Sequence, residues 1–331
     1  MRGGSGGSLA QPVAARRVDV AALFEALASN VERVIQGKRD QVHLALVCLF
    51  AEGHLLIEDV PGVGKTSLAK ALARSIAGSA NRIQFTPDLL PSDVIGVSVW
   101  NRATSQFEFR PGGVFAHVLL GDEINRASPK TQSALLEAME ERQVTVDAHT
   151  WALPRPFLVI ATQNPVELEG TYPLPEAQLD RFLMRLPMGY PDRDAEMAIL
   201  ETHGAGFVGP DDLEPVATAA DVATAADAIT TIHVAPALRA YIVDLVDETR
   251  RDPELALGVS PRGALALQQG ARAMAAGAGR DYVIPDDVKT LASAVLTHRM
   301  IVTPEAELRG VSSEDVLDRI VTRLPVPGAS G

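Results

Sequence analysis

The chain has 331 residues, 47% of them hydrophobic and 22% charged, a composition typical of a globular protein long enough for two domains. Its formal net charge of −12 disfavours the broad phosphate contacts that dominate non-specific binding of nucleic acids, although net charge does not exclude a local basic channel. The single cysteine excludes an internal disulfide bond, and the seven histidines show no spacing typical of a metal site.

The first residues are rich in glycine and serine and lack the apolar core of a signal peptide. We therefore predict a flexible leader over residues 1–17. No apolar run reaches the ~18 to 20 residues that a membrane-spanning helix needs. The sequence therefore predicts a cytoplasmic protein without membrane insertion.

Two helices and a strand are expected before the first glycine-rich loop. Apolar side chains recur every three or four residues over 20–34, and a second helix is expected over 39–51. Residues 54–58, with three apolar residues at their centre, are expected to form a short buried strand, which leads directly into the loop at 61–67. A further amphipathic helix follows this loop and is expected to end near Gly78.

The glycine-rich loop between this strand and this helix is typical of a phosphate-binding site. Backbone N–H groups of such a loop, together with the N-terminal end of the helix, attract phosphate oxygens. Lys65 is expected to reach the β- and γ-phosphates of a nucleotide, and Thr66 to hold Mg²⁺ through its hydroxyl. The general pattern has glycine where this chain has Asp59. The predicted nucleotide-binding residues are Pro61, Gly62, Val63, Gly64, Lys65, Thr66 and Ser67.

The next part of the chain combines short strands with an insertion. A strand is expected over 82–85, and residues 86–113, which proline, aspartate and glycine interrupt, are expected to form a loop and hairpin insertion. Residues 118–120 form an apolar strand that ends at Asp122 and Glu123. Such a pair is often only a solvated strand end, but its place after a phosphate loop favours catalysis. Asp122 would then anchor the metal and Glu123 would polarise the attacking water.

The remaining strands complete an alternating pattern. A helix is expected after the N-cap candidate Ser128, followed by a hairpin over 143–153 and an apolar strand over 157–161. Asn164 follows that strand, where its amide could hold the water or the γ-phosphate, although asparagine before proline is also common in turns. A last strand is expected over 182–186. This alternation predicts a parallel sheet sandwiched by helices.

The pattern changes after residue 190, where we expect helices without strands. The sequence therefore predicts an α/β nucleotide-binding domain over 18–189 and a smaller, all-helical lid domain over 190–331. The helices of this lid are expected at 192–203, 235–251, 261–276, 285–297 and 313–323.

Two arginines are candidates for stabilising the charge that spreads over the γ-phosphate oxygens. Arg181 precedes the last strand, at a sheet edge expected to face a neighbouring subunit, and could serve there as an arginine finger. The alternative for Arg181 is a salt bridge to Asp180 or Glu176. Arg262 begins a lid helix and could swing toward the γ-phosphate as the lid closes, or it could be a solvated first-turn residue.

Five sequence strings resemble the MoxR branch of the AAA+ ATPases, and the resemblance spans roughly residues 20–325. In this family the aspartate at position 59 is usual, so it is no longer an anomaly. Asn125 and Arg126 also match the family, without a clear role. The strings are IEDVPGVGKT (57–66), QFTPDLLPSD (84–93), DEINRA (122–127), QSALLEAMEE (132–141) and ATQNP (161–165).

The resemblance implies a function beyond the motifs themselves. Such proteins are typically hexameric ring ATPases that use Mg·ATP for chaperone-like remodelling, maturation or metal and cofactor insertion of protein complexes. The resemblance implies a protein client and a partner with a von Willebrand factor A domain. It also implies that the segments 86–113 and 143–153 face the pore of the ring. Arg181 matches the arginine finger, and Arg262 matches the second sensor, acting either within its own subunit or across the interface.

Three other interpretations remain open. A magnesium-chelatase-like motor subunit would share the insertions and the type of partner, but the MoxR strings do not favour it. A nucleotide-switched scaffold would assemble with ATP and hydrolyse little of it, yet such scaffolds usually lose one of Glu123, Asn164 and Arg181, all present here. The acidic composition disfavours a DNA-translocating motor.

Overall fold

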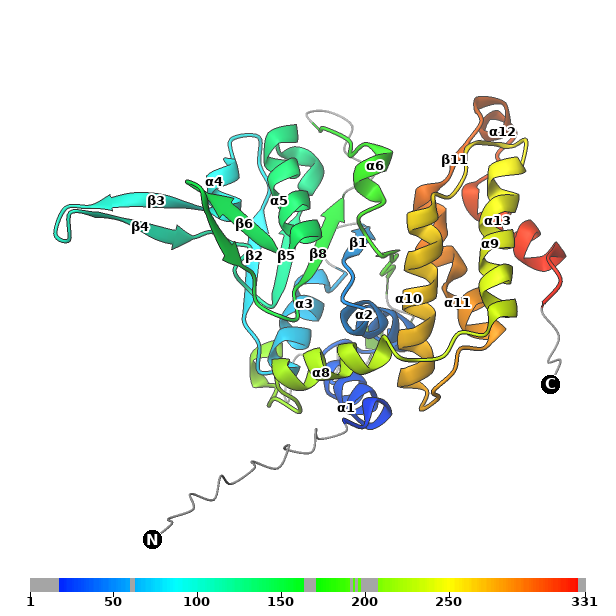
Figure 1. The fold of residues 1–331 in the computed structure, drawn as a ribbon, viewed down its shortest axis with the longest axis horizontal. Coiled ribbons are helices and arrows are strands. Elements are labelled where there is room, and N and C mark those ends of the chain that lie inside the picture. The colour runs from blue at the N-terminus through cyan, green and yellow to red at the C-terminus, as the bar shows by residue number, and fades with distance from the viewer. Residues whose placement is uncertain are drawn as a thin grey trace, which may run out of the picture.

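The structure of the protein is a computed structural model. It describes residues 18–59, 63–163, 171–190, 193, 196–197 and 208–326. The predicted leader and most of the helix expected at 192–203 lie outside these residues. Figure 1 shows an α/β domain that carries two hairpins, with a group of helices packed beside it.

A five-stranded sheet with the strand order β2-β5-β8-β1-β9 forms the centre of the α/β domain. Every neighbouring pair is parallel, so the carboxyl ends of the strands meet at one edge. The five expected strands and their parallel arrangement are confirmed. Their bounds are β1 (Leu55–Glu58), β2 (Ala80–Gln84), β5 (Val118–Asp122), β8 (Leu158–Gln163) and β9 (Met184–Arg185).

The two faces of the sheet bury different hydrophobic clusters. In β1, Leu55 and Ile57 belong to the cluster on one face, whereas Leu56 belongs to the cluster on the other. The strands β5 and β8 alternate in the same way, because successive side chains of a strand point to opposite faces. Burial on both faces explains why these strands are continuous apolar runs in the sequence.

Helices cover both faces of the sheet, as predicted. Residues of α1, α2 and α3 belong to the first cluster, and residues of α5 to the second. As expected, α5 begins after Ser128, whose side chain accepts a hydrogen bond from the N–H of Thr131. The helices of this domain are α1 (Val20–Glu32), α2 (Arg39–Phe50), α3 (Lys65–Ser75), α4 (Pro91–Ile95), α5 (Pro129–Glu141) and α6 (Glu176–Leu179).

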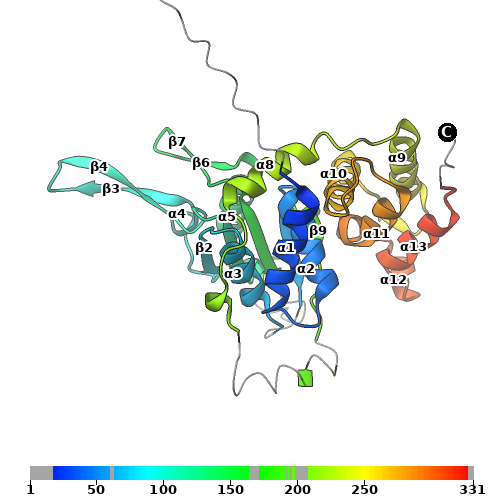
Figure 2. The ribbon, with the colours of Figure 1, turned by 90° about the horizontal axis from the view of Figure 1, so that it is seen from below.

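Two antiparallel hairpins project from the same side of this domain (Figures 1 and 2). Their aromatic side chains touch, because the rings of Phe109 and Trp151 stack with centroids 4.4 Å apart. The longer hairpin lies in the segment expected as an insertion, and the shorter one follows α5. Their strands are β3 (Gly96–Asn101), β4 (Gln106–Pro111), β6 (Gln143–Val146) and β7 (His149–Ala152).

The lid contains the four expected helices within its described part, and the sequence analysis missed two further helices and a pair of strands. The missed helices are α8, whose start is marked by a reciprocal capping interaction between Thr218 and Asp221, and the short α12. The missed strands, β10 and β11, are very short and antiparallel, so the lid is not purely helical. The bounds are α8 (Ala219–Ile229), α9 (Pro236–Arg251), β10 (Leu255–Leu257), α10 (Pro261–Gly277), α11 (Pro285–Leu296), β11 (Ile301–Val302), α12 (Pro304–Leu308) and α13 (Ser313–Arg323).

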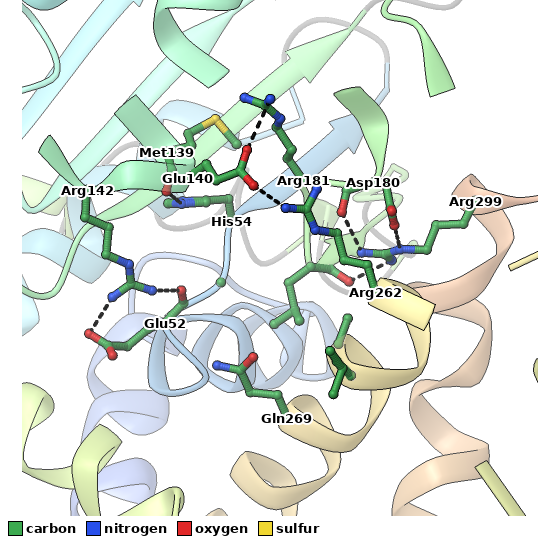
Figure 3. A pocket seen from close by; sticks show the side chains of 14 residues that line it. Glu52, His54, Met139, Glu140, Arg142, Asp180, Arg181, Arg262, Gln269 and Arg299 are labelled. Atoms are coloured by element: carbon green, nitrogen blue, oxygen red, sulfur yellow. Dashed lines mark hydrogen bonds and ion pairs between the residues drawn. The ribbon is translucent and has the colours of Figure 1, made fainter. Parts of the chain in front are cut away.

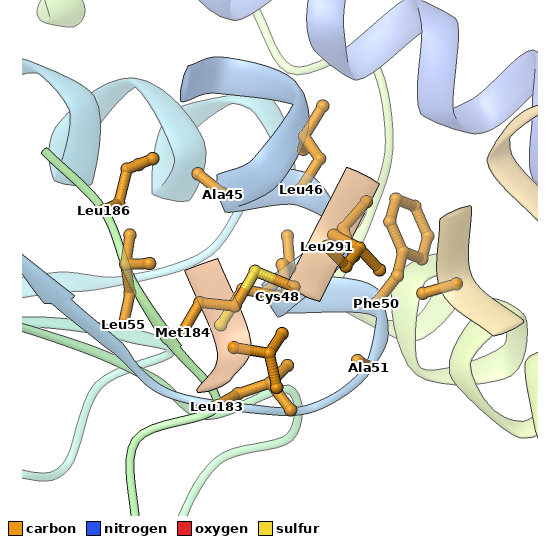
Figure 4. Packing of buried hydrophobic residues seen from close by; sticks show 14 of the residues in the cluster. Ala45, Leu46, Cys48, Phe50, Ala51, Leu55, Leu183, Met184, Leu186 and Leu291 are labelled. Atoms are coloured by element: carbon orange, nitrogen blue, oxygen red, sulfur yellow. The ribbon is translucent and has the colours of Figure 1, made fainter. Parts of the chain in front are cut away.

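One hydrophobic cluster continues from the α/β domain into the lid. Figure 4 shows Leu291 of α11 among Phe50 of α2 and Met184 of β9. Close approach is required where α10 meets α1, since a Cβ added to Gly277 would lie 2.9 Å from the ring of Phe24. The lid is therefore fixed to the first domain by apolar packing. None of the described helices is long and apolar enough to cross a membrane.

His54 joins three elements at the start of β1. Its Nδ1 atom accepts a hydrogen bond from the N–H of Val159 at 3.1 Å, so the ring proton resides on Nε2, which donates to the carbonyl oxygen of Met139 at 3.0 Å. The ring is fully buried, and this burial lowers the pKa of His54 to about 4. The fold therefore requires the neutral imidazole.

We predict that acidification destabilises the protein through His54. The unfolded chain takes up the proton near pH 6.5 and the folded chain only near pH 4, so stability is complete above pH 6.5 and is lost as the pH falls through this window. The loss by pH 4.5 should be about 2 to 3 kcal/mol. Urea unfolding at pH 7.5 and 4.5 measures it, and His54→Asn should show a smaller drop. Equal drops in both proteins would contradict the assignment.

Candidate active site

A cavity of about 350 Å³ opens at the carboxyl ends of four adjacent strands. Sites at this edge are common in parallel sheets, since loops that leave neighbouring strands converge there. The volume falls in the range of small-molecule pockets. It is lined by Asp59, Gly64, Lys65, Thr66, Ser67, Arg82, Gln84, Asp122, Glu123, Thr162 and Gln163.

The glycine-rich loop supplies one wall of this cavity. Gly64 is the N-cap of α3 and has a φ of 90°, a left-handed conformation that favours glycine. The first residues of α3 line the cavity, and the N-terminal end of a helix attracts anions. Lys65 donates a hydrogen bond from Nζ to the carbonyl oxygen of Asp59 at 3.0 Å, which keeps its ammonium group over the loop. Thr66 and Ser67 also line the cavity.

Other predicted residues of the loop lie beside the cavity or outside the described structure. Val63 packs against the hydrophobic cluster and does not line the cavity. Pro61, Gly62 and Asn164 lie outside the described residues. Asn164 follows β8, which lies between β5 and β1 and ends at the cavity with Gln163.

Asp122 ends β5 inside the cavity and is almost fully buried. Its Oδ1 atom accepts a hydrogen bond from the hydroxyl of Thr162 at 3.2 Å. Its Oδ2 atom pairs with Nε of Arg82 at 2.7 Å, so the carboxylate is charge-neutralised. With the hydroxyl of Thr66, Asp122 offers oxygen ligands that suit Mg²⁺, which usually binds through one or two carboxylates together with substrate phosphates.

Glu123 follows Asp122 in a strained conformation, with φ 55° and ψ 50°. Its N–H donates to the hydroxyl of Thr162 at 2.9 Å, which stabilises this left-handed backbone. Its Oε2 atom accepts hydrogen bonds from Gln84 at 2.8 Å and from Arg126 at 3.2 Å. Both donors bind the same oxygen, so the carboxylate can still accept a hydrogen bond from a water through Oε1.

The sequence analysis missed three of these supporting residues, namely Arg82, Gln84 and Thr162. Arg82 and Gln84 are two positions apart in β2, so their side chains point to the same face of the sheet. Only the pairing of β2 with β5 places them beside Asp122. Gln84 and Thr162 each lie within one of the strings that resemble the MoxR family, and this was their only indication in the sequence.

The two predicted arginines lie in a different cavity, between the α/β domain and the lid (Figure 3). Arg181 pairs with Glu140 at 3.1 Å, so the expected alternatives, Asp180 and Glu176, are not its partners. Arg262 pairs with the other carboxylate oxygen of Glu140. The structure therefore brings the two arginines together and separates both from the cavity that contains Lys65.

The buried ion pair between Asp180 and Arg299 helps to position both Arg181 and Arg262. Oδ1 of Asp180 pairs with Nε of Arg299 at 2.6 Å, and Oδ2 accepts a hydrogen bond from Ser260 at 2.9 Å. Asp180 directly precedes Arg181, and Ser260 caps the helix whose first turn contains Arg262. Burial lowers the pKa of Arg299, and the ion pair with Asp180 opposes this effect.

Comparison with known proteins identifies similar chains that cover most of this one. Residues 54–184 match the model of the ATPase family associated with various cellular activities (AAA), and residues 247–320 match an AAA lid domain. The chain is 51% identical to the YeaC protein of Bacillus subtilis over 93% of this chain and 96% of that protein. It is 42% identical to Chaperone MoxR1 of Mycobacterium tuberculosis over 92% of this chain and 81% of that protein.

A solved structure resembles the whole arrangement. A crystal structure of a protein from Cytophaga hutchinsonii, described as an ATPase, has a TM-score of 0.86 and 37% sequence identity. The similarity covers 94% of this chain and 97% of that chain. The relation therefore includes both the sheet and the lid helices.

We predict that Lys65→Ala abolishes measurable binding of ATP. Lys65 is expected to donate charged hydrogen bonds to two phosphates, so its loss should weaken binding by at least about 100-fold. Titration with a fluorescent ATP analogue measures this loss. Lys70→Ala, an exposed change on the same helix, should bind as the wild type does. Unchanged binding by Lys65→Ala would exclude the loop as the phosphate site.

Proposed function

The chain belongs to the MoxR family of AAA+ ATPases, and from this premise we propose that it works as a hexameric ring that remodels protein complexes. In this proposal the energy comes from hydrolysis of Mg·ATP between neighbouring subunits. The work consists of maturation of a client complex or insertion of a metal or cofactor, together with a partner that has a von Willebrand factor A domain. Support comes from the chaperone name of the Mycobacterium tuberculosis relative, which covers nearly the whole chain.

The residues of the first cavity divide the chemical roles in this proposal. Lys65 and the N–H groups at the start of α3 bind the β- and γ-phosphates, while Thr66 and Asp122 hold Mg²⁺. The bound metal neutralises charge on the phosphate oxygens. Glu123 orients and polarises the attacking water, and Asn164 contributes its amide from the end of β8. The hydrogen bonds of Glu123 to Gln84 and Arg126 support this role, because they fix its carboxylate at the mouth of the cavity.

One observation supports action between subunits. Arg181 precedes β9 and so lies at the amino-terminal edge of the parallel sheet, whereas the phosphate cavity lies at the carboxyl edge. Strands of four to six residues separate these edges by about 13 to 20 Å. A side chain at one edge cannot reach a nucleotide at the other. We therefore propose that Arg181 acts on the nucleotide of a neighbouring subunit, and that Arg262, which shares its partner, does the same.

The domain boundaries belong to the same proposal. We propose a nucleotide-binding domain over 18–189 and a lid over 190–331. The segments 86–113 and 143–153 contain the two hairpins, which we place at the pore of the ring. Their common direction in Figures 1 and 2 supports a shared role, as does the stacking of Phe109 on Trp151.

The nucleotide-switched scaffold is the other candidate, and one pair of contacts argues against it. A scaffold that only binds ATP does not need a carboxylate held by two donors at the mouth of the phosphate cavity. In this protein Gln84 and Arg126 both bind Glu123, whose strained backbone is itself stabilised by Thr162. A strained backbone that its surroundings stabilise, like that of Glu123, is typical of catalytic sites.

We predict that Glu123→Gln retains ATP binding and loses hydrolysis. The amide preserves the shape of the side chain but cannot accept a proton, so the rate should fall by about 100- to 10,000-fold. Phosphate release and nucleotide titration on the same preparation separate the two effects. Glu137→Gln, an exposed change on α5, is the control. Wild-type hydrolysis by Glu123→Gln would show that another group activates the water.

We predict that the ATPase rate per subunit rises with protein concentration in the wild type and stays flat in Arg181→Ala. An arginine supplied by a neighbour contributes about 10³- to 10⁵-fold in well-studied phosphoryl transfer, and even a small part of this is measurable. Arg239→Ala, an exposed change on α9, should behave as the wild type. A low rate that is independent of concentration in every protein would favour the scaffold.

A further inference from the structure

Glu140 joins the two arginines in the subunit described here. It lies at the end of α5, and each oxygen of its carboxylate binds a different guanidinium, Oε2 that of Arg181 and Oε1 that of Arg262 (Figure 3). The two arginines come from segments far apart in the chain, one before β9 and one in the lid. A single anion therefore holds together two cations that would otherwise repel each other.

The remaining charges of this cavity are already paired. Arg142 pairs with Glu52 at 2.9 Å, and Arg299 pairs with Asp180 at 2.6 Å. Both Arg142 and Arg299 line the same cavity as Glu140. Within the described lining of this cavity, Glu140 is thus the carboxylate that balances the two proposed catalytic arginines.

The ion pairs of Glu140 differ from that of Arg299 in their exposure. The side chain of Arg299 is 2% exposed, whereas those of Glu140, Arg181 and Arg262 are 34%, 29% and 46% exposed. Half-exposed ion pairs are weak, since water and salt screen them, so they can exchange for another anion at small cost. The ion pair of Arg299 with Asp180 is therefore a buried part of the fold, whereas the two ion pairs of Glu140 can be replaced by contacts with another anion.

Arg181 also has an unused donor. Its Nε atom is buried and has no hydrogen-bond partner in the described part of the protein. The guanidinium therefore has capacity for an acceptor beyond the Glu140 oxygen that it already binds. A guanidinium fork fits a phosphoryl group as well as a carboxylate, because both present two oxygens in similar geometry.

We propose that Glu140 is a positioning residue that holds Arg181 and Arg262 together in the free subunit and releases them to the γ-phosphate of a neighbour's ATP. The carboxylate occupies the place that the phosphoryl group takes in the assembled ring. This inference rests on the proposed action of both arginines across the interface. It predicts that the Glu140 carboxylate competes with the γ-phosphate for the two arginines and so weakens assembly of the ring with ATP. When the γ-phosphate is absent, Glu140 should not affect assembly.

The test measures assembly rather than hydrolysis. Analytical ultracentrifugation of the full chain over a range of concentrations, with Mg²⁺ and the non-hydrolysable analogue AMP-PNP, gives the concentration of half-maximal assembly. For Glu140→Gln we expect this concentration to fall by about two- to tenfold, because weak ion pairs no longer have to be broken. With ADP we expect no shift. Glu141→Gln, the adjacent exposed residue on α5, should match the wild type in both nucleotides.

A second variant and a parallel measurement complete the design. Glu140→Ala removes the same carboxylate and should shift assembly in the same direction. An unchanged or higher half-maximal concentration with AMP-PNP would overturn the inference, and so would an equal shift with ADP. Arg181→Ala is measured alongside. If it assembles with AMP-PNP and hydrolyses ATP as the wild type does, the action across the interface is wrong and the inference falls with it. If the Glu140 variants leave the half-maximal concentration unchanged while Arg181→Ala impairs assembly or hydrolysis, the inference about Glu140 is wrong and the proposed function stands.

Discussion

The buried guanidinium of Arg299 is the polar interaction that, together with the shared apolar core, fixes the lid to the first domain. A charge in the interior is costly unless it is paired and fully hydrogen-bonded. Arg299 meets this condition with Asp180 and with the carbonyl oxygen of Phe182, to which it donates at 2.6 Å. Loss of one partner from such a pair typically costs about 3 to 5 kcal/mol. The segment that carries Arg181 is therefore fixed to the lid, and Ser260 extends this fixation to the helix that carries Arg262.

Because all strands of the sheet are parallel, its two edges differ, and the two cavities lie at opposite edges. The cavity with Lys65, Asp122 and Glu123 lies at one edge of the sheet, and the arginine pair lies at the other. Each subunit thus presents two different surfaces, which meet between neighbouring subunits in the proposed function. Identical chains with such surfaces associate head to tail, and a rotation that closes gives a ring. If the two arginines act on the nucleotide of a neighbour, as proposed, this separation explains why a single subunit would lack a complete site.

The sequence predicted what local patterns encode, and it failed where distant residues meet. The strands, the glycine-rich loop between β1 and α3 and the position of Asp122 and Glu123 at a strand end were predictable, because apolar runs, glycines and strand ends are local features. The helix α8 was missed although Thr218 and Asp221 show the spacing of a capping box. The strands β10 and β11 are too short for any alternation to be visible. The partner of Arg262 was not predictable, since Glu140 lies in another domain and their contact depends on the packing of the lid.

The position of Glu140 connects the arginine pair to the projecting hairpins. Glu140 lies in the last turn of α5, which ends at Arg142 in a left-handed conformation and continues directly into β6 and β7. Trp151 of β7 stacks on Phe109 of β4, so the base of the longer hairpin contacts the shorter one. Tightly packed elements shift as units rather than deform. If Glu140 exchanges partners as proposed, the change therefore acts at the end of α5, which leads directly into the shorter hairpin.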